Sequence, residues 1–487
     1  MSFNTNSIAE EIRGGIEELI ALATGEKSEG ASADQMERCI WWKLLEVGRH
    51  LMQLFFAARR EAAEAGRQVE RDGEVYPYKG QRKREYVSVF GKVEVWRGAY
   101  WKRGRGSVYP LDEALSLPER HYSDWVQEIV SEVSVNQAYE EAVGWVQKWL
   151  PIRQPKRSAQ QLVADQGGLV ASYYEQQAPP QPDGQDTIVV VSADGKGIPM
   201  NREHSPPLAA RRGKGSKKTA KKDATVTALY TIAPYRRGAD EILQALLPET
   251  LPPASAPERR PSPTGKQVFG TLAGKEAALK QAAHQVATRL TGQLTERVAL
   301  TDGSRSLQLK VEKHLPDFTL VLDIIHVTEY LWAAANALLG ETHPGRQWWV
   351  ADALRCVLSD DHYRLFLHLE RQMSRSGLGT NQRKTLKKVL NYLRRNLPYM
   401  DYQHYLAQGW PIGTGVVEGA CRHLVKDRFE RAGMRWSVDG AQALLDLRAV
   451  YLNQDWDDFQ RYRRHSVHQQ RFGSLHPELL AVSSLAA

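Results

Sequence analysis

The sequence predicts a multidomain α/β protein in which a mainly helical N-terminal region with a small β unit precedes a mixed-sheet domain. Its 487 residues correspond to about three domains, since a domain averages roughly 150 residues. In the first third, apolar residues recur at the three- and four-residue spacing of amphipathic helices. Further along, short β-prone runs alternate with helical patterns, which indicates one central sheet covered by helices.

Residues 1–75 are expected to form a helical arm or bundle. The apolar helical period begins at Ile8, and Gly66 is a suitable C-terminal stop. An arm that packs on its own chain and an element that dimerises both fit this pattern, so both interpretations remain open.

Residues 76–122 are expected to form a small β unit. The run YVSVFGKVEVWRGAYW, residues 86–101, is rich in β-formers, and Gly91-Lys92 at its centre marks a hairpin turn. Basic residues flank the run on both sides, which suits either a phosphate-facing surface or an ordinary solvated rim.

Residues 123–177 are expected to form helices around a short basic turn. Two helices are predicted between Ser123 and Gly167, and a capping box of Ser158 with Gln161 is expected to open the second. Two helices joined in this way are compatible with a helix-turn-helix DNA reader, although any packed helix pair has the same pattern.

A linker separates this region from a different kind of sequence. The low-complexity run QQAPPQPDGQ places the linker at residues 178–186, and the sheet domain begins at 187. Residues 248–265 contain six prolines, which indicates a surface loop within that domain.

Aspartates follow three of five predicted strands in the second domain. The β-prone runs are residues 188–192, 225–232, 267–271, 297–301 and 319–325. Asp194 and Asp302 each precede a glycine at a strand end, and Asp323 falls near the end of the last run. Ligands of α/β sheets lie at such edges, whereas the alternative for each aspartate is that it caps a turn or helix.

A later glutamate completes a set of three acids. Glycines precede a predicted helix that carries Glu418, with Arg422 and Lys426 at successive i+4 positions, so one face would carry a carboxylate and two cations. A first-turn glutamate can also simply favour the helix dipole. Two aspartates and a glutamate in one crevice can hold two Mg²⁺ or Mn²⁺ ions about 4 Å apart for phosphodiester chemistry.

Several motifs, in this order, resemble the ISKra-four family of bacterial insertion-sequence transposases over residues 186–456: VVVSADGKGIPM, DATVTALYTIAPY, ALTDGSRSL, LDIIHVTEYLW, GTGVVEGACRHLVKDRFERAGMRW and GAQALLDLRAVYLNQDW. The resemblance implies an RNase H-like catalytic domain with a DDE triad, and a helical insertion before the glutamate. Position by position, Asp194, Asp302 and Glu418 match the metal-binding catalytic acids. The chain lacks the cysteine cluster that some relatives carry near the hairpin.

The same resemblance extends to the Asp323-Ile-Ile-His326 step. It matches a D-x-x-H signature in which His326 would orient or protonate a phosphate oxygen during catalysis, with Asp323 supporting it. A core histidine beside Tyr330 and Trp332 is the alternative.

The long interval between Asp302 and Glu418, 116 residues, leaves room for the implied insertion. The catalytic core is accordingly assigned to residues 187–332 and 409–460, the helical insertion to 333–408 and a C-terminal tail to 461–487.

Basic residues exceed acidic ones, 65 to 57, and gather where DNA contact is expected. Residues 202–222 hold eight basic side chains and one acid, fit for a phosphate clamp or a solvated loop. Residues 371–395 hold eight more and no acid, which predicts a basic amphipathic helix for DNA or, alternatively, a membrane surface. Trp436 is assigned either to base stacking or to packing of the last helix. The candidate DNA-binding residues are Lys196, Arg211, Arg212, Lys214, Lys217, Lys218, Lys221, Lys222, Lys387, Lys388, Arg422, Lys426, Arg435 and Trp436.

These observations predict a DNA transposase that binds double-stranded terminal repeats and target DNA, and the family implies a homo-oligomer. A DNA nuclease without strand transfer and a non-catalytic DNA-binding protein remain the alternatives.

Three dispersed cysteines argue against a disulfide scaffold or zinc ribbon. With neither a signal-peptide pattern nor a long apolar run, we expect no membrane partner and a cytoplasmic, nucleoid-associated protein.

Overall fold

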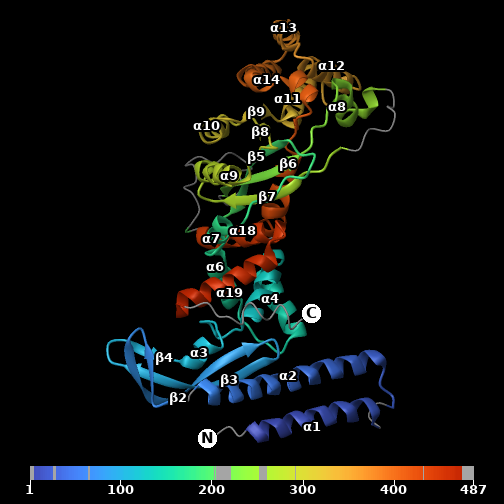
Figure 1. Cartoon of the computed structure of the whole chain (residues 1–487). Helices are drawn as coiled ribbons and strands as arrows, with labels where there is room; N and C mark the ends of the chain where they lie inside the picture. The colour runs from blue at the N-terminus through green and yellow to red at the C-terminus, as the bar shows by residue number, and fades with distance from the viewer. Residues whose placement is uncertain are drawn as a thin grey trace. The chain divides into compact units, whose positions relative to one another are not determined.

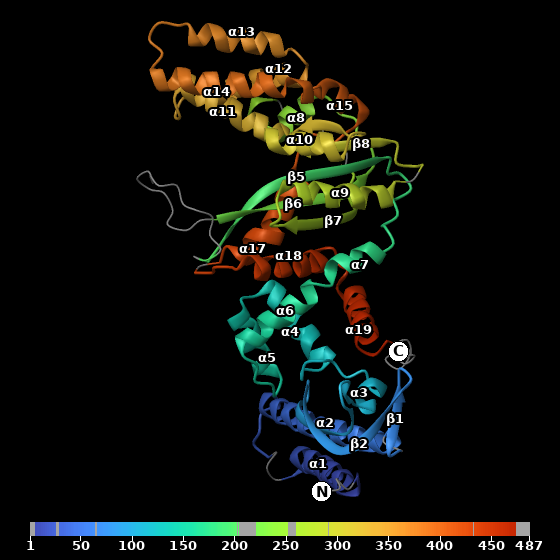
Figure 2. The same ribbon diagram turned by 90° about the vertical axis from the view of Figure 1, so that its left-hand side faces the viewer.

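The computed structural model describes residues 5–25, 29–63, 66–201, 203, 221–251, 260–290, 292–431 and 433–473. The chain is mixed α/β and divides into two compact units, each with its own sheet (Figures 1 and 2). Unit 1 comprises residues 1–173 and 455–487, and unit 2 comprises residues 174–454. The described residues 461–473 therefore belong to unit 1 instead of to a separate tail.

Unit 1 begins with two helices, α1 (Thr5–Thr24) and α2 (Ala33–Ala63), that pack on each other. Ile8 and Ile12 of α1 are buried against Val47 and Ala57 of α2, as the helical period predicts. The expected all-helical stretch ends early, because the first strand begins at Gln68.

The first sheet is four-stranded and antiparallel, in the order β1-β2-β3-β4. Its strands are β1 (Gln68–Arg71), β2 (Glu74–Ser88), β3 (Gly91–Lys102) and β4 (Gly106–Val108). The hairpin between β2 and β3 is present, but the predicted turn position is wrong. Ser88 pairs with Gly91, so Val89 and Phe90 form the turn. Gly91 is the first residue of β3, where its φ of +104° favours glycine.

The remaining helices of unit 1 are α3 (Pro110–Ala114), α4 (Asp124–Asn136), α5 (Tyr139–Trp149), α6 (Lys156–Gly167) and α19 (Trp456–Phe472), and α7 (Val170–Gln176) spans the division between the units. Three helices, not two, fill residues 123–167. Ser123 caps α4 by accepting a hydrogen bond from the Val126 amide. The capping box predicted at Ser158 is wrong, because α6 begins two residues earlier behind Pro155, whose φ of −68° suits a helix start.

The sheet of unit 2 is five-stranded and mixed, in the order β7-β6-β5-β8-β9. β5 pairs in parallel with β8 and β8 with β9, whereas β6 runs antiparallel to both of its neighbours. The strands are β5 (Ile188–Pro199), β6 (Lys221–Ile232), β7 (Thr264–Thr271), β8 (Glu296–Thr301) and β9 (Thr319–Leu322). All five β-prone runs form strands, but the last ends at Leu322, because Asp323 caps the following helix.

The two faces of this sheet are covered by different helical layers (Figure 2). Along β5, Val189 and Val191 pack with residues of α9 (Lys275–Arg289) and α10 (Arg305–His314). Ile188 and Val190 point to the opposite face and join the largest apolar cluster of the unit. This alternation follows from the two-residue period of a strand and explains why both sets are apolar.

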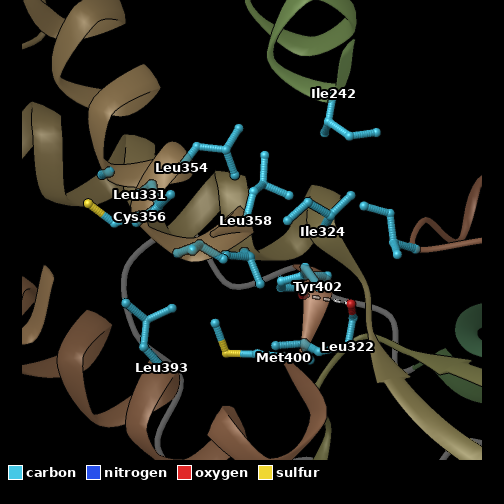
Figure 3. Close-up of a cluster of buried hydrophobic side chains, with 14 of the residues drawn as sticks. Ile242, Leu322, Ile324, Leu331, Leu354, Cys356, Leu358, Leu393, Met400 and Tyr402 are labelled. Atoms are coloured by element: carbon cyan, nitrogen blue, oxygen red, sulfur yellow. Dashed lines mark hydrogen bonds between the residues drawn. The ribbon is translucent and has the colours of Figure 1, made fainter. Parts of the chain in front are cut away.

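The second layer contains the helical insertion. Its helices are α8 (Ala239–Leu246), α11 (Ile324–Leu339), α12 (Arg346–Leu358), α13 (His362–Met373), α14 (Thr380–Asn396) and α15 (Tyr402–Gln408), with short 3₁₀ turns η2 (Pro248–Thr250) and η3 (Leu397–Tyr399). Figure 3 shows part of its core, where the Tyr402 hydroxyl donates to the Leu322 carbonyl oxygen at 2.8 Å. That bond ties the insertion to the end of β9.

The predicted basic helix at residues 371–395 is two helices. α13 ends at Met373 and α14 begins at Thr380, and Gly377 between them has a φ of +98° that interrupts helical geometry. Leu390 and Leu393 of α14 are buried, as expected for its apolar face.

Across the described ranges, no helix combines the length and apolarity needed to span a membrane.

The segment after the insertion carries Glu418 on a broken helix. It consists of α16 (Gly415–Ala420), a π-helix η4 (Cys421–Lys426), α17 (Asp427–Phe429) and α18 (Val438–Leu452). Because a π-turn is wider than an α-turn, the predicted single face through Glu418, Arg422 and Lys426 does not follow from i+4 spacing here.

Candidate active site

Three aspartates lie on neighbouring strands of the second sheet: Asp302 and Asp323 directly follow β8 and β9, and Asp194 lies within β5. Ser192 of β5 pairs with Leu300 of β8, so Asp194 and Asp302 each lie two residues past a paired position. Likewise, Asp302 and Asp323 each follow the paired residues Thr301 and Leu322. Neighbouring strands are about 4.8 Å apart, so register alone brings these three residues to the same level of the three strands.

Asp194 is half-buried and accepts a hydrogen bond from Cys421, three residues after Glu418. Its Oδ1 accepts from the Gly195 amide at 2.6 Å, and its Oδ2 accepts from the Cys421 thiol at 3.5 Å. Burial, with the Asp194 charge as a second cause, raises the pKa of Cys421 far above its ordinary value. The thiol is therefore neutral and serves as a donor to the first acid.

Asp302 is held by the helical insertion. Its Oδ1 accepts from the Ser304 amide at 2.8 Å, while its carbonyl oxygen accepts from the Tyr392 hydroxyl of α14 at 3.2 Å. Arg395, also on α14, donates to the carbonyl oxygen of Gly303 at 3.1 Å. Gly303 has a φ of +80°, and a Cβ there would lie 2.8 Å from the Tyr392 hydroxyl oxygen, so this close approach requires glycine.

Asp323 is completely buried and its carboxylate is fully engaged. Oδ1 accepts from the Ile325 and Thr414 amides, both at 3.1 Å, and Oδ2 accepts from the Thr414 hydroxyl at 2.8 Å. Oδ2 also lies 2.6 Å from Nδ1 of His326. Because both oxygens already have partners, Asp323 holds its neighbours in place and has little capacity to bind a ligand.

His326 projects from the first turn of α11 with a side chain that is 31% exposed. The hydrogen bond to Asp323 raises the pKa of His326 to about 9, and the charges of Asp323 and Asp302 contribute in the same direction. The imidazole is therefore protonated at neutral pH and has Nε2–H available as a donor. This partly exposed cation differs from the core histidine that was the alternative.

Glu418 is exposed on α16 and is connected to Asp323 through Thr414. The Thr414 hydroxyl lies 3.0 Å from Oε1 of Glu418 while it also contacts Asp323. One potential ligand atom from each of Asp323, His326 and Glu418 falls within 4.8 Å of the others. Glu418 therefore reaches the same edge as the strand-borne acids.

The donor chemistry at this edge fits Mg²⁺ or Mn²⁺. Asp302 Oδ2 and Glu418 Oε2 have no hydrogen-bond partner among the described residues, so hard carboxylate oxygens are available. The grouping of Asp323 and His326 with Glu418 is less suitable as a metal site, because Asp323 is saturated and His326 is protonated. Among the described residues, Asp194 and Asp302 do not belong to a group of ligand atoms within 4.8 Å of one another, so Asp194, Asp302 and Glu418 as a ligand set stay a prediction.

Three residues that are not acids also contribute to this arrangement, and their roles were not predicted from the sequence. Thr414 links Asp323 to Glu418, Cys421 contacts Asp194, and Tyr392 holds the Asp302 loop. A threonine immediately before a predicted helix is an N-cap signal that points to Thr414. Tyr392 and Cys421 carry no local pattern, because their roles arise from tertiary contact.

Among the described residues, three of the predicted DNA-binding side chains, Lys196, Lys221 and Lys426, lie close enough to Glu430 to affect its pKa. Arg211, Arg212, Lys214, Lys217 and Lys218 lie outside the described residues. Lys221 forms an ion pair with Glu430 at 2.5 Å, and this contact is the main cause that lowers the pKa of Glu430; Lys196 and Lys426 add to it. The exposed members are Lys387, Lys388, Arg422, Lys426 and Arg435, and the half-buried ones are Lys196 and Lys222.

Trp436 does not have the exposure that base stacking requires. Its side chain is buried, its ring packs on Phe429 at 4.9 Å between centroids, and its indole N–H donates to the Phe429 carbonyl oxygen. The packing alternative therefore describes Trp436, and the base-stacking assignment is corrected.

Comparisons with known proteins supply little beyond this geometry. No known family profile matches the chain, and no curated protein matches it. Among solved structures, the Drosophila P element transposase strand transfer complex aligns with a TM-score of 0.28 and 8% identity, covering 69% of this chain and 94% of that chain. At that TM-score the alignment carries no argument about fold or activity.

Proposed function

We propose that this protein is a DNA transposase of the DDE type, with an RNase H-like catalytic domain in unit 2. In this proposal it binds the terminal inverted repeats of its element, cleaves phosphodiester bonds and joins the 3′ ends to target DNA. The observation that carries the proposal is the position of the three acids relative to the second sheet. Asp302 follows the end of β8, Asp194 lies in the neighbouring parallel strand β5 two residues past its last pair with β8, and Glu418 is linked to Asp323 through Thr414.

The topology around the acids supports the RNase H-like interpretation. A five-stranded mixed sheet has helices on both faces, and its central strand β5 carries the first acid. The helical insertion lies between the second acid and the glutamate and also holds the Asp302 loop. An insertion that contacts the site would explain why 116 residues separate the two acids.

Each side chain of the site would have a defined task. Asp194, Asp302 and Glu418 would hold two Mg²⁺ ions, which when bound would activate the attacking oxygen and stabilise the leaving oxygen. His326, kept protonated by Asp323, would donate a hydrogen bond from Nε2 to a phosphate oxygen.

The exposed cations of α14 and of the Glu418 segment would contact the DNA backbone. Lys387 and Lys388 are exposed on α14, and Arg422, Lys426 and Arg435 are exposed near Glu418. Such contacts supply affinity that depends on salt but not on sequence. Recognition of the terminal repeats and self-association are assigned to unit 1, whose α5 and α6 are the candidate helix-turn-helix.

The test is Mg²⁺-dependent cleavage and joining of a labelled duplex that carries the element's own ends. Glu418→Gln, which keeps the side-chain shape and removes its charge, is expected to abolish both reactions while DNA binding persists. Glu296→Gln is the matched control, because Glu296 begins β8 at the end opposite to Asp302. Cleavage without joining by the wild-type protein would indicate a nuclease. Tight binding without either reaction would indicate a non-catalytic DNA-binding protein.

A further inference from the structure

An open cavity of about 890 Å³ lies within unit 1, remote in sequence from the catalytic acids. Arginines from three segments line it: Arg84 of β2, Arg97 of β3, and Arg463 and Arg471 of α19, together with Arg120. A volume of this size is within the roughly 300–1,000 Å³ range of sites for small molecules. The cavity is lined mainly by polar and charged groups, so its ligand must be polar as well.

Behind the cavity wall, three of these guanidinium groups converge on one buried carboxylate. Arg84, Arg97 and Arg471 all contact the same oxygen, Oδ2 of Asp112, whose side chain is only 2% exposed. The other oxygen, Oδ1, is buried without a hydrogen-bond partner in the described part of the chain. Three positive charges thus face a single negative one, which leaves an excess of two.

This excess is located in a poorly solvated place. The side chains of Arg84 and Arg97 are 10% and 13% exposed. Burial lowers the pKa of Arg97, and the charges of Arg84 and Arg471 act in the same direction. Uncompensated charges removed from water are costly, so an anion that enters the cavity would be strongly stabilised there.

Nearby charges leave this excess largely in place. Arg120 pairs with Asp165 at 2.5 Å and Arg463 pairs with Asp124 at 2.9 Å, so both of these acids are already neutralised. Of the remaining acids that line the cavity, Glu85 pairs with Lys92, and Glu119 is exposed, although its charge acts on Arg471 and offsets part of the excess.

Arg97 has a side-chain donor that no described residue uses. Arg84 is fully committed, since it also donates to the Arg120 carbonyl oxygen at 2.9 Å. Arg97 instead stacks on the Tyr109 ring at 3.8 Å and binds Asp112 through Nη1, while its buried Nε has no hydrogen-bond partner in the described ranges. A fixed guanidinium plane with an unused Nε–H donor is suited to a tetrahedral oxyanion.

We propose that this cavity binds a phosphate monoester group, whose double negative charge matches the excess of two. The phosphate could belong to a small molecule or to the 5′ end of a DNA strand, and the same arginines would recognise either. The inference concerns unit 1 alone and does not depend on the transposase proposal.

The test is calorimetric titration of the full-length protein with inorganic phosphate. Arg97→Gln is expected to weaken binding about 10- to 100-fold, the effect of losing one charged hydrogen bond. Arg471→Gln, at the more exposed edge of the cluster, should weaken it similarly and provides the readout if Arg97→Gln does not fold. Arg105→Gln, an exposed arginine of the same unit outside the cavity, should bind as the wild type does.

Two further titrations separate the sources of the phosphate. Adenosine 5′-monophosphate represents a small ligand, and single-stranded oligonucleotides with a 5′-phosphate or a 5′-hydroxyl represent a DNA end. Binding of either phosphorylated probe that depends on Arg97 supports the proposal and identifies the source. Absence of saturable phosphate binding to the wild type, or binding unchanged in both arginine variants, would overturn it.

Discussion

At the scale of single residues, the four acids of the site differ in how their oxygens are occupied. Asp323 accepts hydrogen bonds on both oxygens, whereas Asp302 and Glu418 each keep one oxygen without a partner in the described residues. Position at a strand end therefore does not by itself make an aspartate a ligand. The donors around it decide whether it binds a cation or holds its neighbours in place.

The role of His326 can be tested without changing the acids. His326→Gln retains a hydrogen-bonding side chain but removes the positive charge that Asp323 maintains. Cleavage is expected to slow by about 100-fold or more, which is typical for loss of a positioned proton donor. DNA affinity, measured by fluorescence anisotropy, should remain unchanged. Full cleavage activity in this variant would mean that His326 only packs.

A second residue-scale prediction concerns a largely buried carboxyl group on α18. Burial raises the pKa of Asp446 to about 7, although Gln442 donates to it at 2.9 Å. Between pH 4 and pH 7, approximately, the folded state keeps this proton and the unfolded state loses it. The contribution of Asp446 to stability therefore decreases as pH rises through this window.

The corresponding variant is Asp446→Asn, which cannot ionise. Relative to wild type, it should gain thermal stability between pH 4.5 and pH 8, because only the wild type acquires a buried charge. Melting temperatures at both pH values measure the difference. Asp439→Asn, an exposed position on the same helix, should show no such change with pH. A pH-independent difference for Asp446→Asn would contradict the argument.

At the scale of elements, the start of α16 determines where Glu418 lies. Thr414 precedes this helix, and its hydroxyl group contacts both Asp323 and Glu418. Thr414→Val keeps the shape but removes both contacts, so cleavage is expected to fall about 10- to 100-fold, as for supporting residues of metal sites. Thr414→Ser restores the hydroxyl group and should recover most of the activity. Equal rates for the two variants would exclude positioning by the hydroxyl group.

Elements with a strong local pattern were predictable from the sequence. The apolar, β-branched runs of unit 2 all became strands, because both faces of the sheet are covered and most positions within these runs are buried. Elements defined by local detail were less predictable. α6 starts at Lys156 instead of at the Ser158 box, and the π-helix after Glu418 has no distinct sequence signal.

The strand end expected at Asp-Gly is correct for Asp302 but wrong for Asp194, because β5 continues to Pro199. Even so, both aspartates followed from the sequence, because each combines an apolar run with Asp-Gly. Their supporting partners did not. Tyr392 lies 90 residues from Asp302 along the chain, and Cys421 lies 227 residues from Asp194. Contacts over such separations depend on the tertiary fold and carry no periodic pattern.

At the scale of the whole molecule, the chain leaves unit 1 and returns to it. α19 packs beside helices that precede it by about three hundred residues, with Arg463 bound to Asp124 and Gln460 to Gln166. The sequence alone assigns this stretch to the core and a tail, since the pattern of an amphipathic helix does not indicate which element it packs on. Because α19 belongs to unit 1, its residue Arg471 lies at the proposed phosphate site.

The net charge of +8 yields a prediction about the proposed DNA contact of the basic run after β5. Lys217, Lys218, Lys221 and Lys222 belong to the basic run after β5, but Lys221 is already paired with Glu430. Replacing all four with glutamine should lower the slope of log binding constant against log salt by roughly three, because each released phosphate contact contributes about 0.9. Lys310→Gln with Lys313→Gln is the control, since both lysines pair with Glu276. If the quadruple variant keeps the wild-type slope, this run does not contact DNA.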